Sequence, residues 1–165
     1  MTRPQHGGGS SAARDVANLG LVRPPLVYLI SLVSGVVVHL VVPAPFLPDT
    51  LAVPLGLPLV AVAVAVFSYS VAKFWASGTP VPGQKPTTVI VRTGPYRFSR
   101  NPIYLAFSVF QLGIAVWVNS VWLLAMLVGA VALIHYVVIR REEQYLERKF
   151  GAPYLDYKAS VRRWL

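Results

Sequence analysis

Residues 103–139 contain no Asp, Glu, Lys or Arg, and this charge-free run constrains the fold more than any other feature of the chain. A transmembrane helix needs about 20 apolar residues, so the run is long enough to cross a bilayer twice. Asn119 and Ser120 lie near its middle and provide a turn so short that the two helices it joins must be antiparallel. The sequence therefore predicts a helical hairpin of residues 102–118 and 121–139, with both ends at the same membrane face.

Two further apolar runs, residues 26–42 and 51–75, precede the hairpin. The chain is 55% hydrophobic and only 13% charged, whereas soluble domains are about 25% charged. We expect an all-α integral membrane protein with four transmembrane helices and short cytoplasmic helices at the C-terminus. The first run could instead be a cleaved signal, but Pro43 and Pro45 stand where a signal peptidase requires small residues and an open backbone.

Three parts of the chain differ in composition. Residues 1–23 are polar and glycine-rich, and we expect a disordered cytoplasmic tail. Residues 24–75 hold the first two spans. Residues 76–165 hold a polar connector, the hairpin and the C-terminal helices, and we expect them to form the functional core. The chain has no cysteine, which excludes disulfides, thiolate metal sites and a cysteine nucleophile; we predict no metal site.

The net charge of +9 reflects 15 basic residues that lie before Pro24, between Lys73 and Arg100, or from Arg140 onward. With four spans, all of them fall on one side of the membrane. Basic residues beside apolar runs face the cytoplasm, so we expect a multi-pass cell-membrane protein with both termini in the cytoplasm. Nucleic acid is a weaker interpretation, because aromatic residues are not interleaved with the basic ones at a base-reading spacing.

Polar residues recur at helical spacing inside the hairpin. Tyr104, Ser108 and Gln111 share one face of the third span, and His135 and Glu142 share a face of the fourth. This phase turns Glu142 toward a cavity and Glu143 toward the basic residues. We interpret Ser108, Gln111 and His135 as a substrate pocket. Two alternatives are open: these polar groups bond across helices as packing contacts, and the two glutamates form ordinary surface ion pairs.

Several short motifs resemble the isoprenylcysteine carboxyl methyltransferase family, which includes phospholipid N-methyltransferases. The resemblance spans roughly residues 78–163 and rests on Gly94-Pro95-Tyr96, Arg100-Asn101-Pro102-Ile103-Tyr104, Glu142-Glu143, and Phe150-Gly151 with Tyr154 and Tyr157. It implies S-adenosylmethionine as the methyl donor, bound at the cytoplasmic side. The histidine of the family motif is replaced here by Asn101, which forms hydrogen bonds but cannot act as a base near neutral pH.

The resemblance implies specific roles for the motif residues. The residues that it implies for cofactor binding are Gly94, Tyr96, Arg100, Asn101, Pro102, Tyr104, Glu142 and Glu143. Arg100, Glu142 and Glu143 are the expected catalytic residues. The expected partners are membrane lipids and a lipidic or isoprenylated acceptor, methylated on a carboxyl group. Alternatives are N-methylation of a phospholipid, S-methylation of a small thiol, and a non-catalytic membrane scaffold protein.

The one-sided distribution of basic residues predicts the membrane topology. Because the chain lacks cysteine, single Thr50→Cys and Ser160→Cys variants can be labelled specifically on intact cells with an impermeant maleimide. We expect Thr50→Cys to be labelled from outside and Ser160→Cys to be labelled only after permeabilisation. External labelling of Ser160→Cys would contradict the orientation.

Overall fold

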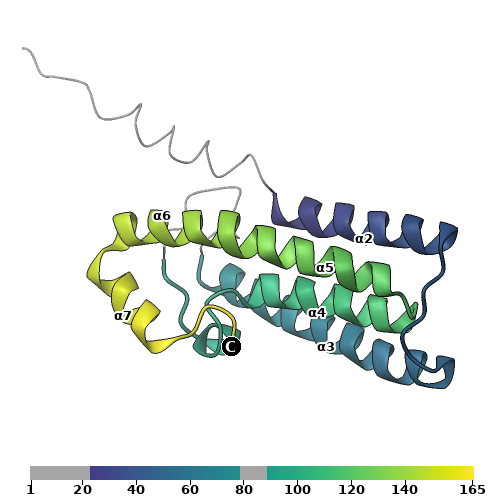
Figure 1. The fold of residues 1–165 in the computed structure, drawn as a ribbon. Coiled ribbons are helices and arrows are strands. Elements are labelled where there is room, and N and C mark those ends of the chain that lie inside the picture. The colour runs from purple at the N-terminus through teal and green to yellow at the C-terminus, as the bar shows by residue number, and fades with distance from the viewer. Residues whose placement is uncertain (1–22, 79–88) are drawn as a thin grey trace, which may run out of the picture.

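The computed structural model describes residues 23–78 and 89–165, and every regular element within these ranges is a helix. The all-α prediction is therefore confirmed for this part of the chain. Four apolar helices lie side by side in Figure 1: α2 (Pro24–Val41), α3 (Asp49–Ala76), α4 (Pro102–Trp117) and α5 (Val121–Leu133). The predicted tail of residues 1–23 lies outside the described residues except for Arg23, as do residues 79–88 of the predicted connector.

Three helical segments among the described residues are long and apolar enough to cross a membrane: Pro24–Val41, Asp49–Ala76 and Val121–Phe150. These segments contain the first, second and fourth predicted spans. The third apolar helix, α4, begins and ends close to the predicted limits but has only 16 residues. The length and composition of these segments thus support a membrane protein. That α4 also crosses the membrane, which would make four spans, stays a prediction.

Glycine allows α3 and α4 to approach closely. A Cβ atom added to Gly56 of α3 would lie 2.5 Å from the backbone nitrogen of Trp117, and one added to Gly113 of α4 would lie 2.8 Å from that of Val60. Small residues at such crossings let helix backbones meet without side chains between them. This close contact holds α4 in a fixed orientation against α3, and so sets the direction of the polar face of α4.

Asn119 connects the loops at the end of the bundle where α4 turns into α5. Its side-chain oxygen accepts hydrogen bonds from the backbone nitrogens of Phe46 and Leu47, both 2.9 Å long. Its amide nitrogen donates to the Leu47 carbonyl and, at 3.0 Å, to Asp49 Oδ1. The predicted turn at Asn119 is therefore confirmed, and a positive φ of 55°, which asparagine tolerates better than most residues, shapes it.

A π-helical segment, η3 (Ile134–Ile139), joins α5 to α6 (Arg140–Phe150) in one long rod. Extra residues in a π turn shift the helical phase of everything that follows. The rod ends at Gly151, with φ 60°, and α7 (Ala152–Ser160) then runs in a new direction. A new helix can begin directly after Gly151, because Pro153 lies in the first turn of α7, where proline is tolerated.

The Gly56 contact predicts a stability difference between two glycine substitutions. We expect Gly56→Ala to lower the free energy of unfolding by about 1–3 kcal/mol, because the new methyl group overpacks the α3–α4 crossing. Gly129→Ala is the matched control, since a Cβ added there meets no atom within 4 Å. Thermal unfolding in detergent measures both. Equal melting temperatures for the two variants would contradict the packing account.

Candidate active site

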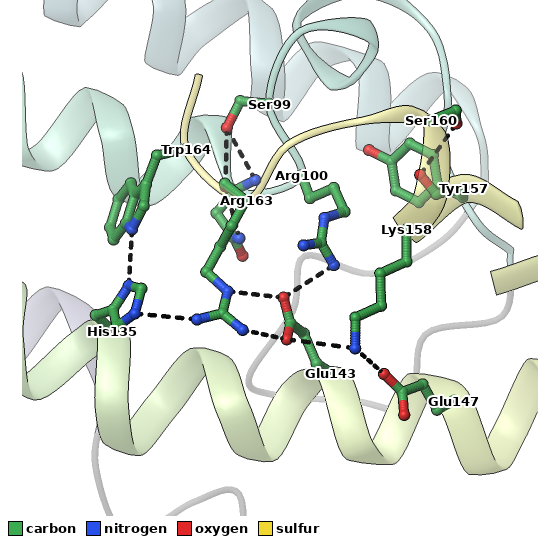
Figure 2. A network of polar contacts seen from close by, with 11 residues as sticks. Ser99, Arg100, His135, Glu143, Glu147, Tyr157, Lys158, Ser160, Arg163 and Trp164 are labelled. Atoms are coloured by element: carbon green, nitrogen blue, oxygen red, sulfur yellow. Dashed lines mark hydrogen bonds and ion pairs between the residues drawn. The ribbon is translucent and has the colours of Figure 1, made fainter. Parts of the chain in front are cut away.

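The carboxylate of Glu143 is buried, with 6% of the residue exposed, and is surrounded by cations (Figure 2). Arg163 binds it through two hydrogen bonds, Nε to Oε1 at 3.0 Å and Nη2 to Oε2 at 2.6 Å. Arg100 Nη1 lies 2.9 Å from Oε1, and Lys158 Nζ lies 4.0 Å from Oε2. Two arginines and a lysine thus offset the cost of burying one negative charge.

Glu142, its neighbour, has different surroundings. The hydroxyl of Tyr104 donates a 2.7 Å hydrogen bond to Glu142 Oε1. Within the described parts of the chain, no cation pairs with Glu142 and no second hydrogen bond reaches it. The two adjacent glutamates therefore divide into one carboxylate saturated by arginine and one held by a single tyrosine.

Tyr104 stands in the first turn of α4, where Pro102 begins the helix. Its carbonyl oxygen accepts hydrogen bonds from Ser108 Oγ at 2.9 Å and from Tyr28 Oη at 3.3 Å. One turn further along, Gln111 Nε2 donates to Ser31 Oγ of α2 at 2.7 Å. Ser108 and Gln111 both reach α2, Ser108 through the Tyr28 hydroxyl at 2.8 Å, so their predicted common face is confirmed as bonds across helices. The Tyr104 side chain instead reaches Glu142 of α6.

The C-terminal segment, residues 161–165, lies against the Arg100-Asn101 motif. The backbone nitrogen of Arg100 donates to the Arg162 carbonyl at 3.0 Å, and Asn101 Nδ2 donates to the Arg163 carbonyl at 3.0 Å. Ser99 Oγ reaches the same Arg163 carbonyl at 3.3 Å. Asn101 thus holds the end of the chain, and that end delivers Arg163 to Glu143.

His135 belongs to this C-terminal network. Its Nδ1 accepts a 2.9 Å hydrogen bond from Trp164 Nε1, and its Nε2 lies 3.0 Å from Arg163 Nη1. Through Arg163 it joins Glu143, so the expectation that His135 and Glu142 share one face is wrong. The physical reason is the π-helical segment between them, because its wider turn rotates the residues that follow it relative to a regular α-helix.

Two motif residues carry buried polar atoms without partners among the described residues. The hydroxyl of Tyr96 makes no hydrogen bond there, although the Tyr96 carbonyl accepts one from Tyr157 Oη at 2.8 Å. Arg100 Nε also makes no hydrogen bond among the described residues. Arg100 Nη1 lies close enough to Glu143 for an ion pair but lacks hydrogen-bond geometry. Gly94, at a φ of 62°, begins the 3₁₀ turn η2 (Gly94–Arg97) that positions Tyr96.

Arg163 and Tyr154 keep their protonation states over the physiological pH range. Hydrogen bonds to Glu143 raise the pKa of the Arg163 guanidinium further above its already high value, although burial opposes this. Burial raises the pKa of the Tyr154 hydroxyl to about 12, the negative charge of Glu143 adds to this, and Arg100 partly offsets it. Arg163 therefore remains a cation, and Tyr154 remains neutral and able to donate a hydrogen bond.

Sequence reasoning missed Arg163, Trp164 and Lys158 as members of the site. The contacts of Arg163 with Glu143 and of Trp164 with His135 are tertiary and leave no spacing pattern in the sequence. His, Asp and Glu residues do not gather in threes as a metal site would require in the described ranges.

A family profile for phospholipid methyltransferases matches residues 51–153, more than half of the chain, including α4, both glutamates and the Gly94–Arg97 turn. The chain belongs to this family. The resemblance inferred from the motifs is thereby confirmed at the level of the family. The protein is a member of a membrane methyltransferase family.

Curated relatives match over shorter stretches. The chain is 36% identical over 81 residues to the nickel-cobalt-cadmium resistance protein NccN of Alcaligenes xylosoxydans xylosoxydans, covering 49% of this chain and 37% of that protein. It is 34% identical over 73 residues to the protein-S-isoprenylcysteine O-methyltransferase of Saccharomyces cerevisiae, covering 44% and 30%. An uncharacterized Haemophilus influenzae protein matches over its whole length, with 41% identity over 64 residues that cover 38% of this chain. The chain thus spans little more than a third of NccN and less of the yeast enzyme. No solved structure matches it significantly.

The different surroundings of the glutamates predict different structural effects of their loss. Glu143→Gln removes the charge that holds Arg163, and hydrogen bonds to a charged group contribute about 1.5–3 kcal/mol. We expect trypsin to cleave after Arg162 and Arg163 roughly tenfold faster in this variant, as followed by mass spectrometry. Glu142→Gln is the matched control and should be digested like the wild type. Equal digestion of the two variants would contradict the assignment of Glu143 to the tail.

Proposed function

We propose that the protein transfers a methyl group from S-adenosylmethionine to a lipidic or otherwise membrane-partitioned acceptor. The observation that carries the proposal is the contrast between Glu143, which pairs with two arginines, and Glu142, whose one hydrogen bond among the described residues comes from Tyr104. A carboxylate at the end of apolar helices that pairs with no cation of residues 23–78 and 89–165 suits a cationic ligand.

The side chains present fit the chemical groups of this donor. Its sulfonium and amino groups are cationic, which suits Glu142 and the ring of Tyr104. Its carboxylate suits Arg100, whose Nε has no partner among the described residues. When bound, S-adenosylmethionine supplies an electrophilic methyl group on a positively charged sulfur. Gly94, Tyr96, Asn101 and Pro102 would shape the surrounding backbone.

The chain's own residues position these groups. Tyr104 orients the Glu142 carboxylate through its 2.7 Å hydrogen bond. Glu143 holds the Arg100 guanidinium through an ion pair, and Arg163 fixes the Glu143 carboxylate. Methylation of a carboxylate cancels opposite charges, so it requires mainly positioning in a site that excludes water. Methylation of an amine needs a base first, and Asn101 cannot provide one.

These considerations favour carboxyl methylation of an isoprenylcysteine-type acceptor, which the name of the yeast relative supports. The family description supports a second candidate, N-methylation of a phospholipid. We place the reaction at the cytoplasmic face of a multi-pass cell-membrane protein with both termini inside, because all 15 basic residues fall on that side of the four predicted spans. The described contacts of Arg100, Tyr104 and both glutamates argue against a non-catalytic scaffold.

Incubation of the purified protein with methyl-labelled S-adenosylmethionine and a membrane extract tests the proposal. We expect label in the lipid-soluble fraction, and about a tenfold or greater loss of initial rate for Glu142→Gln, since a charged hydrogen-bonding group is removed. Glu147→Gln is the matched control on the same helix, because Glu147 pairs with Lys158 and, among the described residues, with none of the side chains proposed to bind the donor. It should retain the wild-type rate.

The chemistry of the labelled product then identifies the acceptor. Label released by mild base marks a carboxyl ester, whereas base-stable label in a phospholipid headgroup marks N-methylation. An unlabelled lipid fraction with the wild type, or equal rates for Glu142→Gln and Glu147→Gln, would refute the proposed function.

A further inference from the structure

A cavity of about 280 Å³ lies between α2, α3 and α4. Its walls are almost entirely apolar and include Ala63, Phe67, Ala106 and Phe107. Small-molecule sites measure roughly 300–1,000 Å³, so this cavity is at their lower limit. Its size and lining suit one hydrocarbon chain better than a two-chain lipid.

The cavity is joined to the candidate active site by Tyr28, which forms part of its wall. The Tyr28 hydroxyl lies 2.8 Å from Ser108 Oγ and donates to the Tyr104 carbonyl at 3.3 Å. The side chain of Tyr104 in turn bonds to Glu142. A chain lying in the cavity would therefore have one end beside the residue that holds the Glu142 carboxylate.

Gln111 is the polar member of the cavity wall and is 2% exposed. Its Nε2 donates to Ser31, but its Oε1 is buried and has no partner among the described residues. The amide orientation does not change this, because the Ser31 hydroxyl can bond either amide atom and the other remains unpaired. An unpaired buried polar atom costs about 1–3 kcal/mol. Gln111 lines the cavity and the terminal torsion of glutamine is broad, so its amide can rotate to meet a polar group there.

We propose that this cavity binds a single hydrocarbon chain of the methyl acceptor, and that Gln111 hydrogen-bonds a polar group carried along that chain. The apolar walls account for the hydrocarbon, and the unpaired amide atom accounts for the polar group. The assignment of the chain to the acceptor rests on the proposed function and on the connection through Tyr28 and Tyr104. The binding itself does not depend on methyl transfer.

Thiol protection measures occupancy directly, because the chain contains no cysteine. In an Ala63→Cys variant, the rate of modification by N-ethylmaleimide reports access to the cavity wall. The probes are stearoyl and hydroxystearoyl lysophosphatidylcholine, each with one chain, and dioleoyl phosphatidylcholine with two. We expect both single-chain probes to slow modification, and the hydroxylated one to bind about three- to tenfold more tightly, as one hydrogen bond provides.

Adding Gln111→Leu should abolish the difference between the stearoyl and hydroxystearoyl probes while both still protect. Persistence of that difference would overturn the role of Gln111. Absence of protection by both single-chain probes would overturn the site. Equal protection by the two-chain lipid would show a structural lipid site and would equally overturn the proposal.

Methyl-transfer rates with the membrane extract link the cavity to the acceptor. Ala63→Leu fills part of the cavity, and Ala65→Leu, on the exposed surface of the same helix, is the matched control. We expect a roughly tenfold lower rate for Ala63→Leu alone, with unchanged donor affinity by calorimetry, which also shows that the variant folds. Equal rates for the two variants would overturn the acceptor assignment. A wild type that binds the probes but transfers no methyl group would refute the proposed function. The cavity would then be a lipid-binding site only, and its assignment to the methyl acceptor would be overturned as well.

Discussion

Burying a carboxylate beside apolar helices requires opposing cations, and Glu143 obtains them from two distant parts of the chain. Arg100 arrives from the segment before α4, and Arg163 arrives from the C-terminal segment. The same segment bonds back to Asn101 through the Arg163 carbonyl. One buried charge thus joins α6, the motif before α4 and the end of the chain, and the rest of the site depends on that junction.

The second glutamate has different surroundings because adjacent residues of a helix point about 100° apart. Glu142 turns toward α4 and meets Tyr104, whose backbone is fixed by Tyr28 and Ser108. A carboxylate that is oriented by a tyrosine, and that pairs with no cation in the described part of the chain, is suited to a positive ligand. In our account one glutamate therefore builds the site and the other binds the donor.

Much of the fold follows from the sequence because apolar periodicity and charge-free length are strong signals. The four apolar helices, the turn at Asn119 and the stop at Gly151 were all predictable. The π-helical segment was not, because residues 134–139 have the composition of an ordinary apolar helix. That segment moves His135 from the side of Glu142 to the side of Glu143. The role of Arg163 was hidden for another reason: a tertiary ion pair leaves no spacing pattern in the chain.

Donor affinity in a double-mutant cycle of Tyr104→Phe and Glu142→Gln, measured by calorimetry with S-adenosylmethionine, tests the central claim most directly. If Tyr104 orients the carboxylate that binds the donor, the two substitutions should not add, and the coupling free energy should be about 0.5–3 kcal/mol. Additive losses, or unchanged affinity in both single variants, would contradict the assignment of Glu142 to the donor.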